Sequence, residues 1–257
     1  MFDRVAVAED AYMTCIDIIA EVQPQGVALE RNGALHVKSG ARIGMMNPSL
    51  VHDATRIDAA VDDAFAFHKD NATPVWNLVT RAIDAGRVGP VAEARGFTNP
   101  VDLPFMILDK IPDAPAHDDL SITRVTDLAG VVEHLHTCAT GFGMNYDDIE
   151  AIATQGFLDP RFIVFVGHVE GRPVTASCAA FSDGAGVPCV GVWNVCTAPD
   201  YRGRGLGHAM TAHAAAAGRD AWGAGVAFLQ SSAMGYPVYL KMGYDEVARW
   251  HRWTPPA

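Results

Sequence analysis

Hydrophobic and polar residues in the second half of the chain repeat with two different periods. In residues 128–140 the apolar side chains recur three and four positions apart, which predicts a helix. Runs rich in β-branched and aromatic residues predict strands at 120–125, 162–169, 173–181, 187–197, 226–230 and 245–253. Further helices are predicted at 146–155, 205–222 and 236–242. The two kinds of segment together predict a mixed sheet packed against helices.

The first half of the chain carries a pattern of the same kind. Asn32-Gly33 lies between the apolar runs 27–30 and 35–38 and is a typical hairpin turn. Further strands are predicted at 41–46, 75–80 and 103–108, and helices at 10–22, 57–68 and 88–95. Residues 111–117 are rich in proline and polar side chains and predict a linker. We therefore expect two domains, residues 1–112 and residues 118–257.

Composition narrows the class of protein. A chain of 257 residues with 49% hydrophobic residues can form one large or two ordinary domains with a packed core. The net charge of −11 argues against a general affinity for nucleic acid or anionic membranes. No apolar stretch reaches transmembrane length, and charged residues interrupt any signal-peptide pattern. The five cysteines form no C-x-x-C pair, which is typical of reduced thiols in a cytoplasmic protein.

Histidine spacing gives no support for a metal site. His134 and His136 are two positions apart on a predicted helix and therefore face different sides. His208 and His213 also miss the i, i+4 spacing of a helical ligand pair. We therefore expect no metal cofactor.

The strongest chemical signal is the turn Arg202-Gly203-Arg204-Gly205-Leu206-Gly207, between a predicted strand and an alanine-rich helix. A helix that begins in glycines presents unpaired N–H groups and the positive end of its dipole to an anion. With two arginines beside it, the turn predicts a diphosphate cradle. A P-loop would need Lys followed by Ser or Thr, and a dinucleotide fingerprint would need an acidic residue ending a second strand, whereas Asp220 lies in a helical pattern. On these six residues alone, an ordinary turn remains the alternative.

The residues around this turn resemble two signatures of the GNAT acetyltransferase family. Arg-x-x-Gly-x-Gly follows a strand that ends in Val195-Cys196-Thr197-Ala198-Pro199, as in the acetyl-coenzyme A (acetyl-CoA) signature. Residues 232–244 resemble the second signature, in which a small polar residue ends a strand, a short helix carries a tyrosine, and Gly-Tyr opens the last strand. The resemblance covers residues 118–257 and implies the GNAT acyl-CoA N-acyltransferase fold, a mixed α/β sheet with helices on both faces.

The first half repeats the later order of elements: three strands, then helix, strand, helix, strand. Ala94-Arg95-Gly96-Phe97 lies where Met242-Gly243-Tyr244 lies in the second half. After the third predicted strand, however, Asn47-Pro48-Ser49-Leu50-Val51 contains neither a glycine pair nor an arginine. We interpret this half as a degenerate GNAT-like domain in a tandem protein, without coenzyme binding. An unrelated α+β substrate-binding domain is the alternative.

The resemblance also implies where the coenzyme binds. The strands before and after the turn splay apart, and the backbone of Val195, Cys196 and Thr197 pairs with the pantetheine. A backbone N–H near Cys196 or Thr197 polarises the thioester carbonyl. The other expected coenzyme-binding residues are Arg202, Gly203, Arg204, Gly205, Leu206, Gly207, His208 and Ser232. A solvated Arg204 without a coenzyme contact is an equal alternative.

Acyl transfer to an amine needs a neutral nucleophile, a stabilised oxyanion and a proton for the leaving thiolate. Family members place a tyrosine beside the sulfur, so the resemblance makes Tyr239 the candidate acid. A thiol has a pKa of about 8.5 and a phenol of about 10, so hydrogen bonding to the thiolate is as good an interpretation as full proton transfer. The alternative is that Tyr239 only packs under the sheet.

The general base is not evident from the sequence. Many family members carry a glutamate on the strand before the turn, but residues 190–195 contain no carboxylate. Asn194 is the candidate for orienting a water or the acceptor, although an amide cannot take up the proton. A distant carboxylate such as Glu133 or Asp147, acting through water, is a further hypothesis. A nucleophilic Cys196 is disfavoured, because strand cysteines are usually buried and inert.

We therefore expect an acetyl-CoA-dependent N-acetyltransferase that acts on an amine of a small molecule or protein by direct attack in a ternary complex. The acceptor is expected in a cleft between the halves, shaped partly by residues 128–155. A non-catalytic acyl-CoA-binding sensor or scaffold of the same fold is the alternative. We expect no nucleic-acid or membrane partner, a monomer or homodimer, and a cytoplasmic location.

Overall fold

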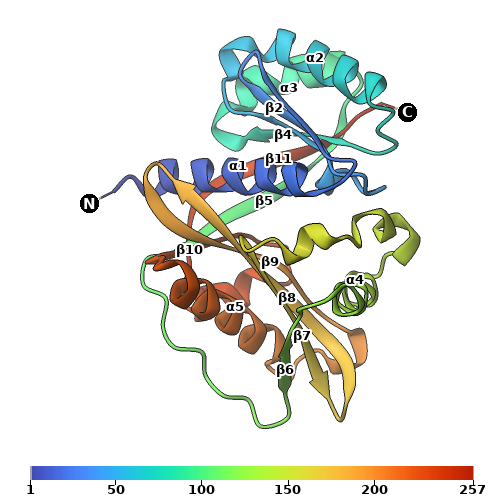
Figure 1. Ribbon diagram of the computed structural model, residues 1–257. Helices are drawn as coiled ribbons and strands as arrows, with labels where there is room; N and C mark the ends of the chain where they lie inside the picture. The colour runs from blue at the N-terminus through green and yellow to red at the C-terminus, as the bar shows by residue number, and fades with distance from the viewer. Residues whose placement is uncertain (1, 257) are drawn as a thin grey trace.

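Eleven strands form one continuous sheet in the computed structural model, which describes residues 2–256 (Figure 1). The strands are β1 (Val27–Arg31), β2 (Ala34–Lys38), β3 (Pro48–Val51), β4 (Asn77–Arg81), β5 (Thr98–Leu108), β6 (Ser121–Arg124), β7 (Phe162–Val169), β8 (Arg172–Gly184), β9 (Val187–Thr197), β10 (Val226–Gln230) and β11 (Asp245–Thr254). The α-helices are α1 (Arg4–Val22), α2 (Ile57–Asp70), α3 (Ala85–Ala94), α4 (Leu128–Phe142), α5 (Leu206–Trp222) and α6 (Tyr236–Lys241). The strands lie in the order β1-β2-β3-β4-β11-β5-β10-β9-β8-β7-β6.

The two halves of the chain have the same order of elements. The first half runs α1-β1-β2-β3-α2-β4-α3-β5, and the second runs α4-β7-β8-β9-α5-β10-α6-β11. Each half contains three consecutive antiparallel strands. A parallel neighbour follows in each, with β4 beside β3 and β10 beside β9. The repeat of elements predicted from the sequence is therefore present.

The halves exchange their last strands at the centre of the sheet. Strand β5 of the first half pairs with β10 of the second, with Phe105 opposite Gln230. Strand β11 of the second half pairs with β4 of the first, with Trp250 opposite Arg81. β5 and β11 also pair with one another. The division at residues 112–118 stays a prediction, while the pairing joins the two halves through their closing strands.

Helices cover both faces of the sheet. Val164 and Phe105 belong to the core that contains α1 and α4, whereas their chain neighbours Ile163 and Met106 pack with α5 and α6. Successive residues of a strand point to opposite faces, so these helix pairs lie on opposite sides. In the first half, Val79 faces α1 and its neighbour Leu78 packs with α2 and α3. Hence α1 and α4 share one face, and the other four helices share the opposite face.

Most strands lie where the pattern predicted them, but the third strand predicted at 41–46 is wrong. The chain forms a short 3₁₀ helix at Gly44–Met46 there, and β3 begins at Pro48. The cause is the buried Asn47, whose side-chain nitrogen donates to the carbonyls of Ala41, Ile43 and Val75 and so holds this segment as a loop. The segment Pro48–Val51, read from the sequence as the loop after the third strand, is itself the strand.

The helix predicted at 146–155 is also wrong. The segment instead contains the 3₁₀ helices Tyr146–Asp148 and Glu150–Ile152. Ile149 and Ile152, three positions apart, are both buried. A 3₁₀ turn repeats every three residues, so it brings both isoleucines onto the core.

Candidate active site

The parallel pair β9–β10 opens along its length. Pairing joins Val226–Phe228 to Cys189–Gly191, whereas β9 continues to Thr197. On the other edge, the register between β8 and β9 shifts between Ala176–Cys196 and Cys178–Trp193, and Asn194 adopts φ 56°. This is a β-bulge, which bends the strand and re-aims a side chain. The opening gives β9 a free backbone edge beside α5, to which an extended ligand can hydrogen-bond.

The glycine turn lies directly beyond this free edge. Gly203 has φ 77° and Gly205 has φ 81°, a left-handed conformation that glycine adopts without strain. Gly205 is the N-cap of α5, and no side chain caps the helix there. A Cβ at Gly203 would meet nothing within 4 Å. The turn is therefore open, and the first amides of α5 face an uncapped site suited to an anion.

The rest of the turn is held by its neighbours. Leu206 is buried against Val169 and Val174, which fixes the first residue of the helix. Gly207 follows it, and a Cβ added there would lie 3.8 Å from the Thr197 hydroxyl oxygen. His208, the next residue, is exposed. The helix start is thus rigid while its solvent side stays accessible.

Both arginines of the turn already have protein partners. Arg202 donates from Nε to the Thr197 carbonyl at 3.2 Å and from Nη2 to the Gly141 carbonyl at 2.9 Å, so it ties the end of α4 to the turn. Arg204 forms an exposed ion pair with Asp119 at 3.0 Å. Its guanidinium also lies 5.6 Å from the centre of the Tyr201 ring. Exposed pairs of this kind are weak, so Arg204 is free to exchange partners.

The side chains at the end of β9 point to different neighbours. Val195 packs against the core formed with α5 and α6. The buried Cys196 thiol lies 3.6 Å from the Thr137 carbonyl of α4. The Thr197 hydroxyl lies 3.2 Å from the Thr175 hydroxyl. The thiol of Cys196 thus faces α4.

Tyr239 lies on α6, with its ring packed 5.9 Å from that of Tyr244 and only 8% of the residue exposed. Burial raises the pKa of its phenol above the ordinary value of 10, and a hydrogen bond with Thr211 of α5 partly offsets this rise. The phenol is therefore protonated at neutral pH and able to donate a hydrogen bond. Ser232, in contrast, accepts from the Gly235 N–H at 3.1 Å and shapes the turn before α6.

Asn194 is held by a buried histidine that the sequence patterns did not identify as part of this site. His134 is fully buried on α4, and its Nδ1 lies 3.0 Å from the Phe165 carbonyl. A carbonyl only accepts, so Nδ1 carries the proton and Nε2 is an acceptor. Nε2 lies 3.2 Å from Nδ2 of Asn194, which must therefore donate to it. This fixes the orientation of the amide and leaves the Asn194 side-chain oxygen free.

We expect His134→Gln to weaken the pH dependence of stability. Burial lowers the pKa of His134 to about 4 from 6.5. Between these values the unfolded chain binds a proton that the folded chain does not, so the contribution of His134 is present above pH 6.5 and is lost as the pH falls toward 4. At pH 5 the loss is about 2 kcal/mol relative to pH 8. Urea unfolding at pH 8 and pH 5 should show a fall smaller by this amount in the variant, and an unchanged fall would contradict the buried neutral state.

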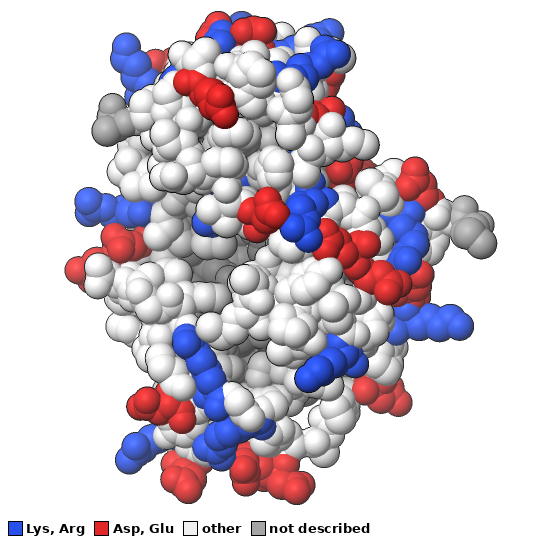
Figure 2. All heavy atoms as spheres, turned by 180° about the vertical axis from the view of Figure 1, so that it is seen from behind, with Lys and Arg blue, Asp and Glu red and all other residues white. Residues whose placement is uncertain are grey.

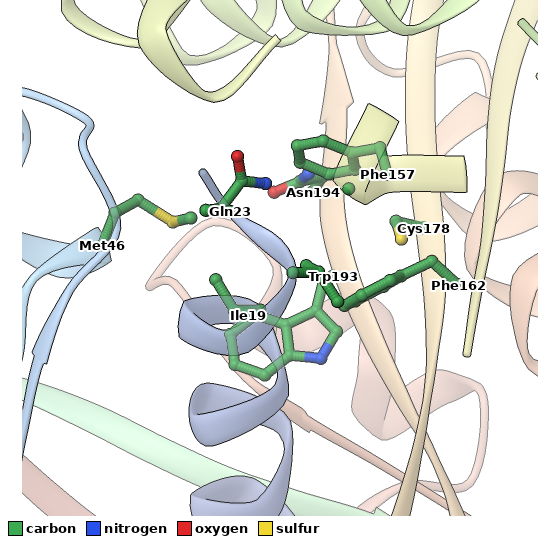
Figure 3. Close-up of a pocket in the computed structure, with 10 residues that line it drawn as sticks. Ile19, Gln23, Met46, Phe157, Phe162, Cys178, Trp193 and Asn194 are labelled. Carbon is green, nitrogen blue, oxygen red and sulfur yellow. The ribbon is translucent and has the colours of Figure 1, made fainter. Parts of the chain in front are cut away.

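A pocket lies between the two halves, on the side of the sheet that carries α1 and α4. Its lining residues from the first half are Ile19, Val22, Gln23 and Met46, and those from the second are Gly156, Phe157, Phe162, Cys178, Trp193 and Asn194. Figure 3 shows the Gln23 amide beside that of Asn194, with the two aromatic rings of Trp193 and Phe162 below them. The pocket therefore meets the open part of β9 at Asn194.

The pocket differs from the sequence expectation in one respect. A cleft between the halves was expected to be shaped partly by residues 128–155, but none of them lines this pocket. Their contribution is indirect, through His134 behind Asn194. Gln23 and Met46 were not predicted at all, because no local pattern relates them to a site more than a hundred residues away. Of the two distant carboxylates considered as a base, Glu133 pairs with His168 at 3.4 Å.

Figure 2 shows the molecule from behind, hollowed near its middle, with mostly uncharged side chains around the hollow and charged side chains of both signs above and below it. Within residues 2–256, no group of three His, Cys, Asp or Glu side chains is arranged to hold a metal ion. No helix in the same described range has the length and apolar character needed to cross a bilayer.

Comparison with known proteins matches part of the chain to one family model and the whole chain to one fold. Residues 160–246 match the family model described as an acetyltransferase (GNAT) domain. This match spans the open strand pair, the glycine turn and Tyr239, so the resemblance found in the two sequence motifs is confirmed. No curated protein matches the sequence.

Solved structures extend the likeness over the whole chain. A GCN5-related N-acetyltransferase from Kribbella flavida is similar with a TM-score of 0.70 and 13% identity, covering 100% of this chain and 97% of its own. A GCN5-related N-acetyltransferase from Sphaerobacter thermophilus has a TM-score of 0.54 and 17% identity, covering 98% and 93%. A tandem GNAT protein from the clavulanic acid biosynthesis pathway has a TM-score of 0.54 and 14% identity, covering 94% and 88%. The prediction of a tandem GNAT fold is confirmed.

Proposed function

We propose that this chain, which carries a GNAT acetyltransferase domain at residues 160–246 and has a tandem GNAT fold, transfers an acetyl group from acetyl-CoA to an amine. The observation that carries the proposal is the opening of β9 and β10 beyond Gly191, followed along the chain by an uncapped helix N-terminus, with the buried Tyr239 in the core that contains Val192 of β9 and Leu229 of β10. The free edge of β9 suits an amide-containing arm of a ligand, and the anion site at the start of α5 suits a diphosphate on the same ligand.

The residues present fit such a donor. The backbone of Val195–Thr197 would pair with the amide groups of the pantetheine arm, and the first amides of α5 would hold the diphosphate. The open space at Gly203 supports this assignment, because a bulky group can approach the backbone there. Arg204 would exchange its exposed pair with Asp119 for a phosphate, whereas Arg202 would keep the turn in place.

The thioester supplies an activated carbonyl. The protein's own groups would stabilise the oxyanion, assist the departing sulfur and orient the amine. A backbone N–H near Cys196 or Thr197 would donate to the carbonyl oxygen as it gains charge after attack by the amine. Tyr239 would donate its hydrogen bond to the departing sulfur, for which its protonated state is suited. The free oxygen of Asn194 would accept a hydrogen bond from the amine and orient it.

The first half has a supporting role in this proposal. Its own parallel pair stays closed, since all four residues of β3 pair with β4. The turn that follows carries Asp53, whose carboxylate accepts from the Thr55 N–H where an anion would otherwise bind. Gln23 and Met46 of this half instead form one wall of the pocket beside Asn194. We therefore propose one donor site per chain and an acceptor pocket built from both halves.

The test is release of free thiol from acetyl-CoA by the full-length protein with a panel of small amines and amine-containing peptides. We expect no release without an amine, because attack is direct, and equal amounts of thiol and acetylated product, because each transfer forms one of each. Micromolar binding of acetyl-CoA without turnover on any amine would favour the sensor or scaffold alternative. The absence of both binding and turnover would refute the proposed function.

A further inference from the structure

The segment that connects the two halves is bound to both ends of α5. Residues 109–120 join β5 to β6 without forming a helix or a strand, and Figure 1 shows them as the green loop that leads past α5. Arg219, in the last turn of α5, donates to the Asp113 carboxylate at 2.9 Å. Arg204, just before the helix, pairs with Asp119 at 3.0 Å. The connecting segment therefore reaches the glycine turn that we propose for the diphosphate.

His117 of this segment contacts the glycine turn itself. Its Nε2 lies 2.9 Å from the carbonyl oxygen of Arg204. A carbonyl only accepts, so Nε2 carries a proton and donates to it. The same Nε2 lies 3.7 Å from the position that a Cβ at Gly205 would occupy, so the ring lies against the N-cap of α5. Within residues 2–256 the buried Nδ1 of this ring has no hydrogen-bond partner, so its hydrogen bonding is to the turn alone.

This hydrogen bond sets the direction of one peptide group in the turn. In a planar trans peptide the C=O and the N–H point in opposite directions. Because His117 holds the Arg204 carbonyl toward its own ring, the N–H of Gly205 points away from the ring. Gly205 is the N-cap of α5, so its N–H has no acceptor within the helix and is available to an anion. Glycine adopts several backbone conformations with similar ease, and the bond from His117 favours one of them.

We infer that His117 is a positioning residue for the coenzyme, which holds the Arg204–Gly205 peptide in the orientation that binds the diphosphate; this rests on the proposed function. Its effect reaches the donor through the phosphate groups and not through the thioester. His117 precedes the residues 160–246 that match the acetyltransferase family model. The connecting segment thus supplies the proposed site with a residue from outside the matched domain.

Two acetyl donors test the inference, because both have the thioester and the pantetheine arm, and acetyl-CoA alone has the diphosphate. The assay uses the full-length protein and the amine that gives the fastest thiol release. His117→Leu should lower kcat/KM for acetyl-CoA at least about five-fold through KM, with kcat unchanged, because a hydrogen bond to the diphosphate is lost. kcat/KM for S-acetylpantetheine, which lacks the diphosphate, should stay within about two-fold. An equal loss with both donors, or a loss with neither, overturns the inference.

Two further variants assign the effect to the hydrogen bond. A glutamine can place its amide nitrogen near the position of the ring Nε2, so His117→Gln should keep kcat/KM for acetyl-CoA within about two-fold of wild type. Asp113→Ala removes the exposed pair with Arg219 at the other end of α5 and should also stay within about two-fold. A loss in either variant as large as that in His117→Leu would contradict a role for this one bond.

Calorimetry separates failure of the inference from failure of the proposed function. If wild type acetylates an amine and His117→Leu binds acetyl-CoA with unchanged Kd, the proposed function stands and the inference is wrong. A Kd raised at least about five-fold in His117→Leu, with the free energy of unfolding in urea unchanged, supports the inference even where no amine is acetylated. Neither binding nor thiol release by wild type removes both.

Discussion

Gly205→Glu is expected to abolish binding of acetyl-CoA. Gly205 caps the N-terminus of α5 with φ 81°, no side chain caps the helix there by a hydrogen bond, and the His117 ring lies 3.7 Å from the position of an added Cβ. A carboxylate there would lie against the amides that we propose for the diphosphate. Two like charges about 4 Å apart near a protein surface repel by about 4 kcal/mol. Calorimetry should therefore show a Kd raised at least about 100-fold.

Gly223→Glu is the matched control. Gly223 caps the other end of the same helix with φ 66°, and a Cβ added there meets nothing within 4 Å. Both variants place a glutamate at positive φ, so each should lose roughly 1–2 kcal/mol of stability. The control also places a negative charge at the unfavourable end of the dipole, so it is the stricter test of folding. If it loses binding equally, or if Gly205→Glu binds normally, the diphosphate does not lie at this helix.

Local patterns located most of the elements of the second half. Strands β7 and β10 have the bounds predicted from the sequence, because β-branched and aromatic runs flanked by turn residues mark them clearly. The central exchange of β5 and β11 had no such signal. The residue pattern of β5 and β11 would be the same if each strand paired within its own half. Their place in the sheet depends instead on pairing between segments far apart in sequence. Periodicity therefore predicts that these strands exist but not their order in the sheet.

The third strand of the first half shows how a single side chain overrides a pattern. Residues 41–46 are mostly apolar and resemble a strand, but Asn47 donates to the carbonyls of Ala41 and Ile43 and holds the segment as a loop. The resulting structure buries Ala41 without any sheet pairing. An asparagine that competes for backbone groups was visible in the sequence, but its partners were not.

The sequence predicted those parts of the candidate site that form a continuous motif. It did not identify the residues that reach the site from distant segments. The turn from Arg202 to Gly207 and the helix with Tyr239 each carry a local motif; the turn follows the open end of β9, and Tyr239 packs in the core that contains Val192 of β9 and Leu229 of β10. His134 lies sixty residues before Asn194, so only the fold relates them. Gln23 reaches the same pocket from the first half. A degenerate half that has lost the cradle thus remains part of the proposed acceptor site.

Tyr239→Phe is expected to lower kcat about 100-fold while acetyl-CoA binds within about two-fold of wild type, because general-acid assistance acts only as the thiolate leaves. The ring packs 5.9 Å from Tyr244 and is retained in the variant, so only the hydroxyl is lost. Burial holds the pKa of this phenol above its ordinary value, so it keeps its proton between about pH 6 and 9. The loss of kcat should therefore be the same across this range.

Tyr236→Phe, on the same short helix, separates the hydroxyl of Tyr239 from a general effect on α6. The Tyr236 hydroxyl donates to Glu246 at 2.7 Å, and this contact lies outside the proposed site. This variant should keep kcat within about two-fold, since losing a hydrogen bond at the surface changes stability little. Pre-steady-state and steady-state thiol release would compare the two. Equal kcat in Tyr239→Phe and wild type would mean that Tyr239 only packs against the sheet, and that the departing thiolate receives its proton from solvent.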